Sequence, residues 1–182
     1  MPKDIWIISD THFQHENILK FEPTRPGSTI QEHDEALIDN WNSVVKPGDK
    51  VYHLGDVVMG NKETFPKLWA KLHGKKRLIV GNHDNIRYLS SGAFFEKVML
   101  WRVWKEWNMI FTHVPVSLQT LGEGRTGRDL ALNVHGHIHS NPSPVGPYRC
   151  VCVEQTNYTP INLEELKCEF NKSSTINFNI TV

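Results

Sequence analysis

Residues that can bind metal ions follow five short apolar runs along this chain. The polar clusters are Asp10-Thr11-His12, Gly55-Asp56, Gly81-Asn82-His83-Asp84, His113-Val114-Pro115 and Gly136-His137-Ile138-His139. The apolar runs that precede them predict buried strands at Ile5–Ile8, Val51–Leu54, Leu78–Val80, Met109–Phe111 and Leu132–Val134. Because the carboxyl ends of strands meet at one edge of an α/β sheet, we expect the clusters to form one site. Asp, His and Asn side chains suit divalent metal ions, so the pattern indicates an enzyme.

The ordered pattern resembles the calcineurin-like metallophosphoesterase superfamily over residues 10–139. It is most similar to small bacterial and phage phosphoesterases, and the shared stretches are Ser9-Asp10-Thr11-His12-Phe13, His15-Glu16-Asn17-Ile18, Arg25-Pro26, Trp41-Asn42 and Tyr52-His53-Leu54-Gly55-Asp56. Those relatives often carry Gly where this chain has Gln14. The resemblance implies an α/β fold, a two-sheet mixed β-sandwich flanked by helices in four αββα layers.

The same resemblance implies a site for two divalent metal ions. Asp10, His12 and His139 would hold one ion, Asn82, His113 and His137 would hold the other, and Asp56 would bridge them. A carboxylate suits the bridge because each of its oxygens can bind one cation. Such a site hydrolyses phosphate esters by attack of a water that the two ions activate. Manganese is the expected metal, and iron, zinc or nickel would accept the same ligands.

Beside the metal ligands, the resemblance assigns catalytic roles to His83 and Asp84. His83 would protonate the leaving oxygen or stabilise its charge, and Asp84 would orient the imidazole. Asn82 would be a neutral ligand, which leaves positive charge on the site and favours an anionic substrate.

Four residues are candidates for substrate contacts. His15 follows the first motif closely enough to line the cleft, but a simple loop role fits equally well. Arg25 could bind a phosphate or pair with a surface acid such as Glu22, and the resemblance favours the phosphate. Arg125 and Arg128 lie in the glycine-rich stretch 119–129, which predicts either a phosphate-contacting loop or a solvated loop with no role.

The other histidines, the tryptophans and the cysteines are expected to have structural roles. His33 is predicted on a solvated helix surface, whereas His53 and His135 are predicted in the core or behind the ligands. We expect most of the six tryptophans in the core and not as base-stacking platforms. Three cysteines give no disulfide framework, and Cys150 and Cys152 are expected to be buried thiols.

Spacing and capping signals predict the remaining elements. One helix is expected at about 30–45, with a capping box from Thr29 to Glu32, and another near 62–72, with Asn61 as its N-cap. Further strands are expected at 98–103, 107–111 and 148–153, and an alternating edge strand at 175–182.

Length and charge limit the class of protein. The 182 residues predict a single domain over 1–182, and 20 basic residues balance 20 acidic ones, so no global field attracts nucleic acid. The chain shows neither a membrane-spanning run nor a signal-peptide pattern, and we therefore expect it in the cytoplasm of a bacterium or of a phage-infected host. The sequence does not indicate an oligomeric state.

The leading hypothesis is a metal-dependent phosphoric ester hydrolase that favours phosphodiesters, such as small or cyclic nucleotides. A nuclease acting on single-stranded nucleic acid and a phosphomonoesterase are the enzymatic alternatives. A non-catalytic binding scaffold is the third class, and the presence of all the ligands and of His83 argues against it. The second motif continues as Val57-Val58-Met59 and not as the Asp-Arg-Gly of protein Ser/Thr phosphatases, which argues against that activity.

Overall fold

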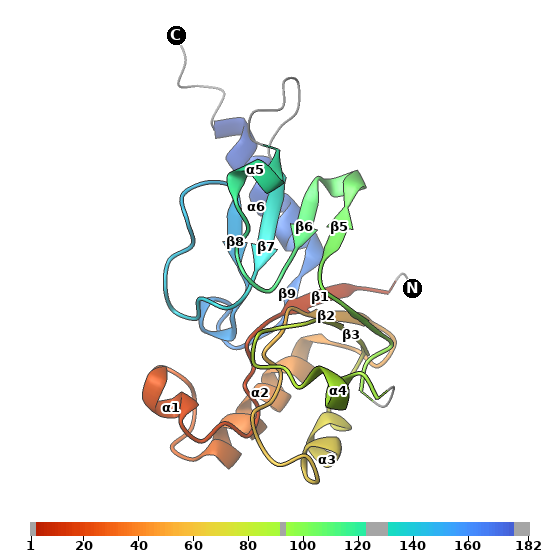
Figure 1. Ribbon diagram of the computed structural model, residues 1–182, viewed down its shortest axis with the longest axis vertical. Coiled ribbons are helices and arrows are strands. Elements are labelled where there is room, and N and C mark those ends of the chain that lie inside the picture. The colour runs from red at the N-terminus through yellow and green to blue at the C-terminus, as the bar shows by residue number, and fades with distance from the viewer. Residues whose placement is uncertain (1–2, 92–93, 123–130, 177–182) are drawn as a thin grey trace.

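The structure of the protein, a computed structural model, describes residues 3–91, 94–122 and 131–176. Two mixed β-sheets flanked by helices form the fold, as the resemblance implied (Figure 1). The first sheet contains β1 (Ile5–Ile8), β2 (Lys50–His53), β3 (Lys75–Ile79), β4 (Lys97–Met99) and β9 (Ile161–Asn162). The second contains β5 (Arg102–Trp104), β6 (Met109–Phe111), β7 (Leu132–His135) and β8 (Tyr148–Cys150). Their spatial orders are β4-β3-β2-β1-β9 and β5-β6-β7-β8.

Parallel pairing brings the ends of the ligand-bearing strands level with one another. Ile8 pairs with His53, and His53 pairs with Leu78, so β1, β2 and β3 end together. In the second sheet, Phe111 of β6 lies opposite Val134 of β7, again in parallel. The polar clusters that follow these strands therefore leave the sheets on the same side, as the sequence predicts.

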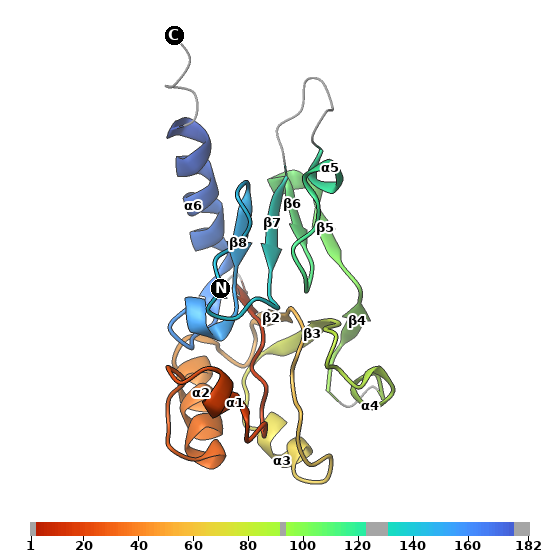
Figure 2. The same cartoon turned by 60° about the vertical axis from the view of Figure 1, so that its left-hand side comes forward.

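Helices cover the first sheet on the side away from the second sheet (Figure 2). The helices on the side of the first sheet are α1 (Ile18–Phe21), α2 (Ile30–Val44), α3 (Phe65–Trp69) and α4 (Ile86–Leu89), whereas α5 (Leu118–Leu121) and α6 (Leu163–Ile176) lie beside the second sheet. The predicted capping box of α2 is present, because Thr29 accepts from the Glu32 backbone and Glu32 accepts from the Thr29 backbone. Buried Leu37 and Trp41 of α2 pack with Trp69 of α3 against the sheet. No helix among the described residues is long and apolar enough to cross a bilayer.

Several elements differ from their predicted bounds. The helix expected near 62–72 is limited to α3, because Asn61 accepts from the Glu63 backbone in a turn and Thr64 takes the N-cap position. The strand expected over 98–103 is two strands, because the chain leaves the first sheet after Met99 and enters the second at Arg102. Trp101 lies at this crossing and is 58% exposed, so it departs from the expected core position.

The C-terminal helix α6 was not predicted from the sequence. The edge strand expected over 175–182 is wrong for residues 175–176, which end α6, and the remainder lies outside the described residues. Leu163, Leu166 and Phe170 share one helical face and pack into the core between the sheets. The Lys167 ammonium lies 4.2 Å from the ring centroid of Trp107, which adds a cation–π contact between α6 and the turn before β6. The apolar spacing of this face was the available signal.

Leu166→Ala tests whether α6 belongs to the cooperative core. Leu166 is 0% exposed, and its truncation is expected to lower the free energy of unfolding by about 2–5 kcal/mol, because a cavity remains. Cys168→Ala, on the exposed side of the same helix, is the matched control and is expected to change it by less than about 0.5 kcal/mol. Urea denaturation followed by circular dichroism measures both. Equally small effects would show that α6 packs outside the core.

Candidate dinuclear metal centre

The first group of candidate ligands consists of Asp10, His12 and His139, each with one ligand atom within 4.8 Å of the others. Oδ1 of Asp10 lies 3.9 Å from Nε2 of His12 and 3.9 Å from Nε2 of His139. Oδ1 of Asp10 and both ring nitrogens of His12 are buried without a hydrogen-bond partner among the described residues. A divalent cation between Oδ1 of Asp10 and Nε2 of His12 would satisfy these two atoms, so the residues fit a metal ion.

The second group consists of Asp56, His113 and His137, again with ligand atoms within 4.8 Å of one another. Oδ1 of Asn82 lies 2.8 Å from Nε2 of His113 and 2.9 Å from Nδ1 of His137. The amide oxygen therefore points at the ring nitrogens where a second cation would lie. All the residues that the resemblance names as ligands are brought to these two groups.

Asp56 lies between the two groups. Its Oδ2 is 3.7 Å from Nε2 of His12 and 3.5 Å from Nε2 of His113. Its Oδ1 accepts a 2.9 Å hydrogen bond from the backbone N–H of His83. One oxygen of Asp56 thus faces both groups, whereas the sequence interpretation gave one oxygen to each cation.

The electrostatics of the site favour a cation near the buried carboxylates. Burial raises the pKa of Asp10. Burial opposes ionisation of Asp56 as well, but the hydrogen bond and charge of His113 lower the pKa of Asp56 to about 2. Burial also lowers the pKa of His113, yet Asp56 and Asp10 outweigh that effect and raise it to about 9. The pair of carboxylates therefore draws positive charge to this position.

The backbone of the ligand clusters lies in the left-handed region, where non-glycine residues are uncommon. The φ angles are 58° for Asp10, 48° for His12, 56° for Asp56, 72° for His137 and 52° for His139. Backbone hydrogen bonds hold the first cluster in place, from Asp10 N to the Gly55 carbonyl and from His12 N to the Asp56 carbonyl, each 3.0 Å long. Strain that surrounding bonds maintain is typical of functional sites.

Glycines let these strand ends approach one another closely. A Cβ at Gly136 would lie 2.3 Å from Oδ2 of Asp10, and a Cβ at Gly81 would lie 2.2 Å from Oδ1 of Asp56. Both distances are far below van der Waals contact. Glycine at positions 81 and 136 is therefore required for the close packing of the two carboxylates.

A surrounding layer of hydrogen bonds orients the ligands. Nδ1–H of His113 donates to the Leu54 carbonyl at 2.7 Å, and Nδ1 of His139 lies 3.0 Å from Oε1 of Glu154. Each contact directs the other ring nitrogen toward the site, which is how outer partners usually fix metal-binding histidines. Oδ2 of Asp10 accepts from the Ser9 hydroxyl, the His137 backbone and the Cys152 thiol at 2.5, 2.9 and 3.2 Å.

Asp84 does not have the expected role beside His83. Its carboxylate accepts from the backbone N–H groups of Gly81, Asp56 and Val57 at 2.8, 3.1 and 2.9 Å. These bonds tie the second and third clusters together, and none of the described contacts joins the carboxylate to the imidazole of His83. Asp84 is thus a positioning residue, and burial raises its pKa.

His83 and His15 lie at the rim of the centre. The ring of His83 is exposed, and its centroid is 5.8 Å from that of the candidate ligand His12. The His15 centroid is 5.7 Å from the same ring, and burial together with the charge of His83 lowers the pKa of His15. Both imidazoles are therefore close enough to a bound ester to contact it.

Arg25 is buried, and protein groups instead of a free phosphate position surround its guanidinium, so the phosphate contact expected from the resemblance stays a prediction. Its guanidinium donates to Oε1 of Glu154 through Nε at 2.8 Å and to the carbonyl oxygens of Asp10 and Thr11 at 2.7 and 2.9 Å. His33, expected on the surface, is buried beside it, with Nε2 at 3.3 Å from Nη1.

Glu154 was missed by the sequence analysis, since no motif marks it. The alternative interpretation of Arg25 was an ion pair with a surface acid such as Glu22, and the acid that it pairs with is the buried Glu154. Arg125 and Arg128 lie outside the described residues. His53 and His135 are buried as expected.

Arg25→Met separates a structural role from a substrate contact. Removing one partner of a buried ion pair leaves Glu154 unpaired, and we expect a loss of about 3–5 kcal/mol in the free energy of unfolding. Arg149→Met removes a more exposed arginine from its pair with Glu169 and is expected to cost about 1 kcal/mol or less. Urea denaturation in the presence of a chelator measures both. If Arg25→Met unfolded like the wild type and only raised KM, Arg25 would act on the substrate.

Comparison with known proteins identifies a family for this chain. The model of the family described as calcineurin-like phosphoesterase matches residues 3–173. An uncharacterized protein of Methanocaldococcus jannaschii is 34% identical over 171 residues, which cover 89% of this chain and 88% of the relative. The gene 66 protein of Mycobacterium phage L5 is 27% identical over 161 residues, 74% of this chain and 77% of that protein.

A solved structure has a similar fold. The crystal structure of a protein of unknown function from Aquifex aeolicus is similar with a TM-score of 0.72 and 25% identity, over 92% of this chain and 100% of that one. The family implies a metal-dependent phosphoesterase with a site for two divalent ions, and the described Asp and His groups are candidate ligands for them. The chain therefore belongs to the calcineurin-like phosphoesterase family.

Proposed function

We propose that the protein hydrolyses phosphodiesters, with small or cyclic nucleotides as its substrates and manganese as the preferred metal. The observation that carries this proposal is the position of Asp56, whose Oδ2 lies within 3.7 Å of His12 and 3.5 Å of His113, one residue from each ligand group. Two ions bound there would activate the attacking water and neutralise the phosphate oxygens. Asp10, His12 and His139 would hold one ion, and Asn82, His113 and His137 the other.

His83 acts at the leaving oxygen in this proposal. Its backbone N–H donates to Oδ1 of Asp56, so the turn after β3 that carries the imidazole is fixed directly against the bridging carboxylate. The ring is exposed and free to reach an ester bound between the ligand groups. A protonated imidazole there would donate a proton to the departing alkoxide.

Diesters are favoured over monoesters because of the charges around the site. A phosphate monoester carries an additional negative charge, which a further cation would have to balance. Arg25 was the expected cation in the described part of the chain, and its guanidinium is bound to Glu154 instead. This burial supports a substrate with one negative charge on phosphorus.

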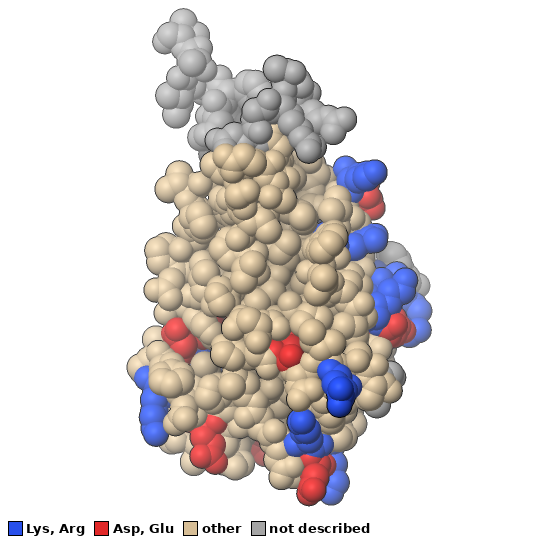
Figure 3. Space-filling view, in the orientation of Figure 1, with Lys and Arg blue, Asp and Glu red and all other residues tan. Residues whose placement is uncertain are grey.

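A nuclease acting on single-stranded nucleic acid is the second candidate, supported by Trp101. Its side chain is 58% exposed and follows β4, the neighbour of the strand that leads to Asn82. An exposed indole can stack on an unpaired base. Against this candidate, Lys and Arg gather along the right-hand edge and lower rim of the face in Figure 3, and few lie on its broad centre.

We further propose that the protein acts in the cytoplasm. Cys150, Cys152 and Cys168 are all free thiols, and the first two are buried, as expected. Reduced cysteines are typical of cytoplasmic proteins.

Asp56→Asn is expected to remove activity and the occupancy of one metal site together, because the bridging charge is lost. We would supply metal-stripped protein with Mn²⁺, Zn²⁺, Ni²⁺ or Mg²⁺, measure the bound metal by mass spectrometry, and compare hydrolysis of bis-p-nitrophenyl phosphate and p-nitrophenyl phosphate. Wild-type protein is expected to bind two ions and to prefer the diester, with Mn²⁺ the most effective metal. Asp39→Asn, an exposed aspartate on α2, is the control and should behave like the wild type. Two ions retained with full activity in Asp56→Asn would contradict the bridging role.

His83→Ala is expected to leave metal binding intact and to lower kcat in a way that depends on the leaving group. For diphenyl phosphate, whose leaving group requires protonation, the loss should reach about 100-fold or more. For bis-p-nitrophenyl phosphate the loss should be much smaller, because p-nitrophenolate leaves without a proton. His73→Ala, an exposed histidine after α3, is the matched control. Equal losses on the two esters would rule out proton donation by His83.

A further inference from the structure

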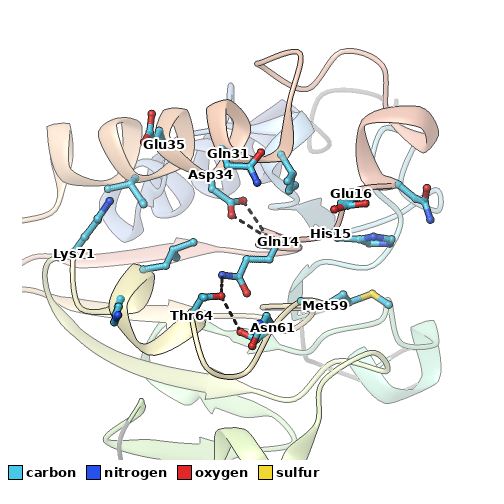
Figure 4. A pocket seen from close by; sticks show the side chains of 16 residues that line it. Gln14, His15, Glu16, Gln31, Asp34, Glu35, Met59, Asn61, Thr64 and Lys71 are labelled. Atoms are coloured by element: carbon cyan, nitrogen blue, oxygen red, sulfur yellow. Dashed lines mark hydrogen bonds between the residues drawn. The ribbon is translucent and has the colours of Figure 1, made fainter.

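A cavity lies beside the candidate metal centre, between α2, α3 and the loop that follows His12 (Figure 4). Its volume is about 780 Å³, which is within the range of sites for small organic ligands. Residues of α2 form one wall, residues 59–71 form the other, and residues 14–17 form the floor. In Figure 4, His15 lies at one end of the cavity and Lys71 at the opposite end.

The His15 end of the cavity adjoins the candidate ligands. The ring of His15 is 5.7 Å from that of His12, and His15 N donates to the His12 carbonyl at 3.1 Å. A phosphate ester bound at the ligand groups can therefore extend past His15 into the cavity. This direction places the organic part of the substrate in the cavity and its phosphate outside it.

Gln14 lies in the middle of the cavity lining and has a buried hydrogen-bond acceptor without a partner. Its Nε2 donates to the Thr64 hydroxyl at 2.8 Å, and that hydroxyl donates to the Asn61 carbonyl at 3.3 Å. Because the Thr64 hydrogen is used in this way, the Gln14 carboxamide must direct its N–H to Thr64. Oε1 of Gln14 is left buried with no donor among the described residues. A buried carbonyl in this state favours a ligand that brings a donor.

A continuous set of polar contacts joins this cavity to the metal centre. The Asp34 carboxylate accepts from the Gln14 backbone at 3.2 Å and lies 3.1 Å from Nδ1 of His33. His33 contacts the Arg25 guanidinium at 3.3 Å, and Arg25 donates to Glu154, which contacts His139. A cavity residue and a candidate metal ligand thus belong to one buried network. The cavity lining is therefore connected to the candidate metal site by direct polar contacts.

We propose that this cavity binds the nucleoside of a nucleotide phosphodiester, an inference that rests on the proposed function. The N–H and O–H groups of a nucleoside would donate to Oε1 of Gln14 and to the Asp34 carboxylate. Met59, which is 42% exposed, and Leu68 supply apolar surface that can pack against the flat face of a base. A polyol has no such apolar face, so this surface favours a nucleoside. Acidic and basic side chains both line the cavity, with Asp34 near its middle and Lys71 at the end far from His15, so the phosphate is placed at the ligand groups by the candidate metal ligands and not by repulsion from the cavity.

The test varies one alcohol of the diester and keeps the leaving group constant. The substrates are the p-nitrophenyl esters of thymidine 5′-phosphate and of phosphorylcholine, together with bis-p-nitrophenyl phosphate. Wild-type protein is expected to have its lowest KM for the thymidine ester. Gln14→Gly tolerates the left-handed backbone at φ 62° and removes the acceptor, and it should raise that KM by about tenfold. Asn108→Gly makes the same kind of change at φ 48° in the turn before β6 and should keep the preference.

Binding provides a readout that does not depend on turnover. In equilibrium dialysis, Gln14→Gly should raise the Kd for thymidine 5′-monophosphate by about tenfold, and Asn108→Gly should leave it unchanged. A lowest KM for the choline ester would mean that the cavity selects positive charge, which overturns the proposal. An equal effect of Gln14→Gly on all three esters, or an unchanged Kd, also overturns it. Failure to hydrolyse any ester with two ions bound would count against the proposed function, while dialysis would still decide on the cavity.

Discussion

The structure depends on the burial of two carboxylates, Asp10 and Asp56, where the two sheets meet. Both are almost fully buried, and moving a charged carboxylate out of water costs several kcal/mol unless partners replace the lost hydration. Asp10 receives three donors at Oδ2, and Asp56 receives a backbone donor at Oδ1. The remaining oxygens face imidazoles. The protein thus satisfies one side of each carboxylate and leaves the other side for cations.

This arrangement explains the unusual backbone of the ligand clusters. Along a regular strand, Asp10 and His12 would project from the same face with their Cα atoms about 6.6 Å apart, and the chain would continue past the site. Left-handed turns at Asp10 and His12 instead fold the chain so that both side chains face the cation position, while Thr11 between them contacts His53. Each such residue costs about 1–3 kcal/mol, and the bonds to Gly55 and Asp56 hold it there.

The sequence predicted the parts of the fold and of the site that local signals encode. Short apolar runs ending in Asp, Asn or His identified the ligand strands, and a capping box identified α2. Partnerships over long sequence separations were not predictable in this way: Glu154 lies 129 residues from Arg25 and carries no motif. The resemblance assigned Asp84 to the imidazole of His83, whereas its carboxylate accepts from backbone groups of Gly81, Asp56 and Val57. Trp101 departs from the core because β4 and β5 belong to different sheets.

Arg25 shows why residue type alone does not define a substrate contact. A guanidinium has five N–H donors, and the five contacts of Arg25 engage Nε with Glu154, Nη1 with Thr11 and His33, and Nη2 with Asp10 and Glu154. Binding a phosphate would require breaking several of these contacts inside a buried region. Instead, the same cation fixes the carbonyl groups beside a candidate ligand, holds the carboxylate that orients His139, and reaches His33 on α2. Its contacts therefore join the residues beside the metal centre to the α2 wall of the neighbouring cavity, from Asp10 and Glu154 through Arg25 to His33.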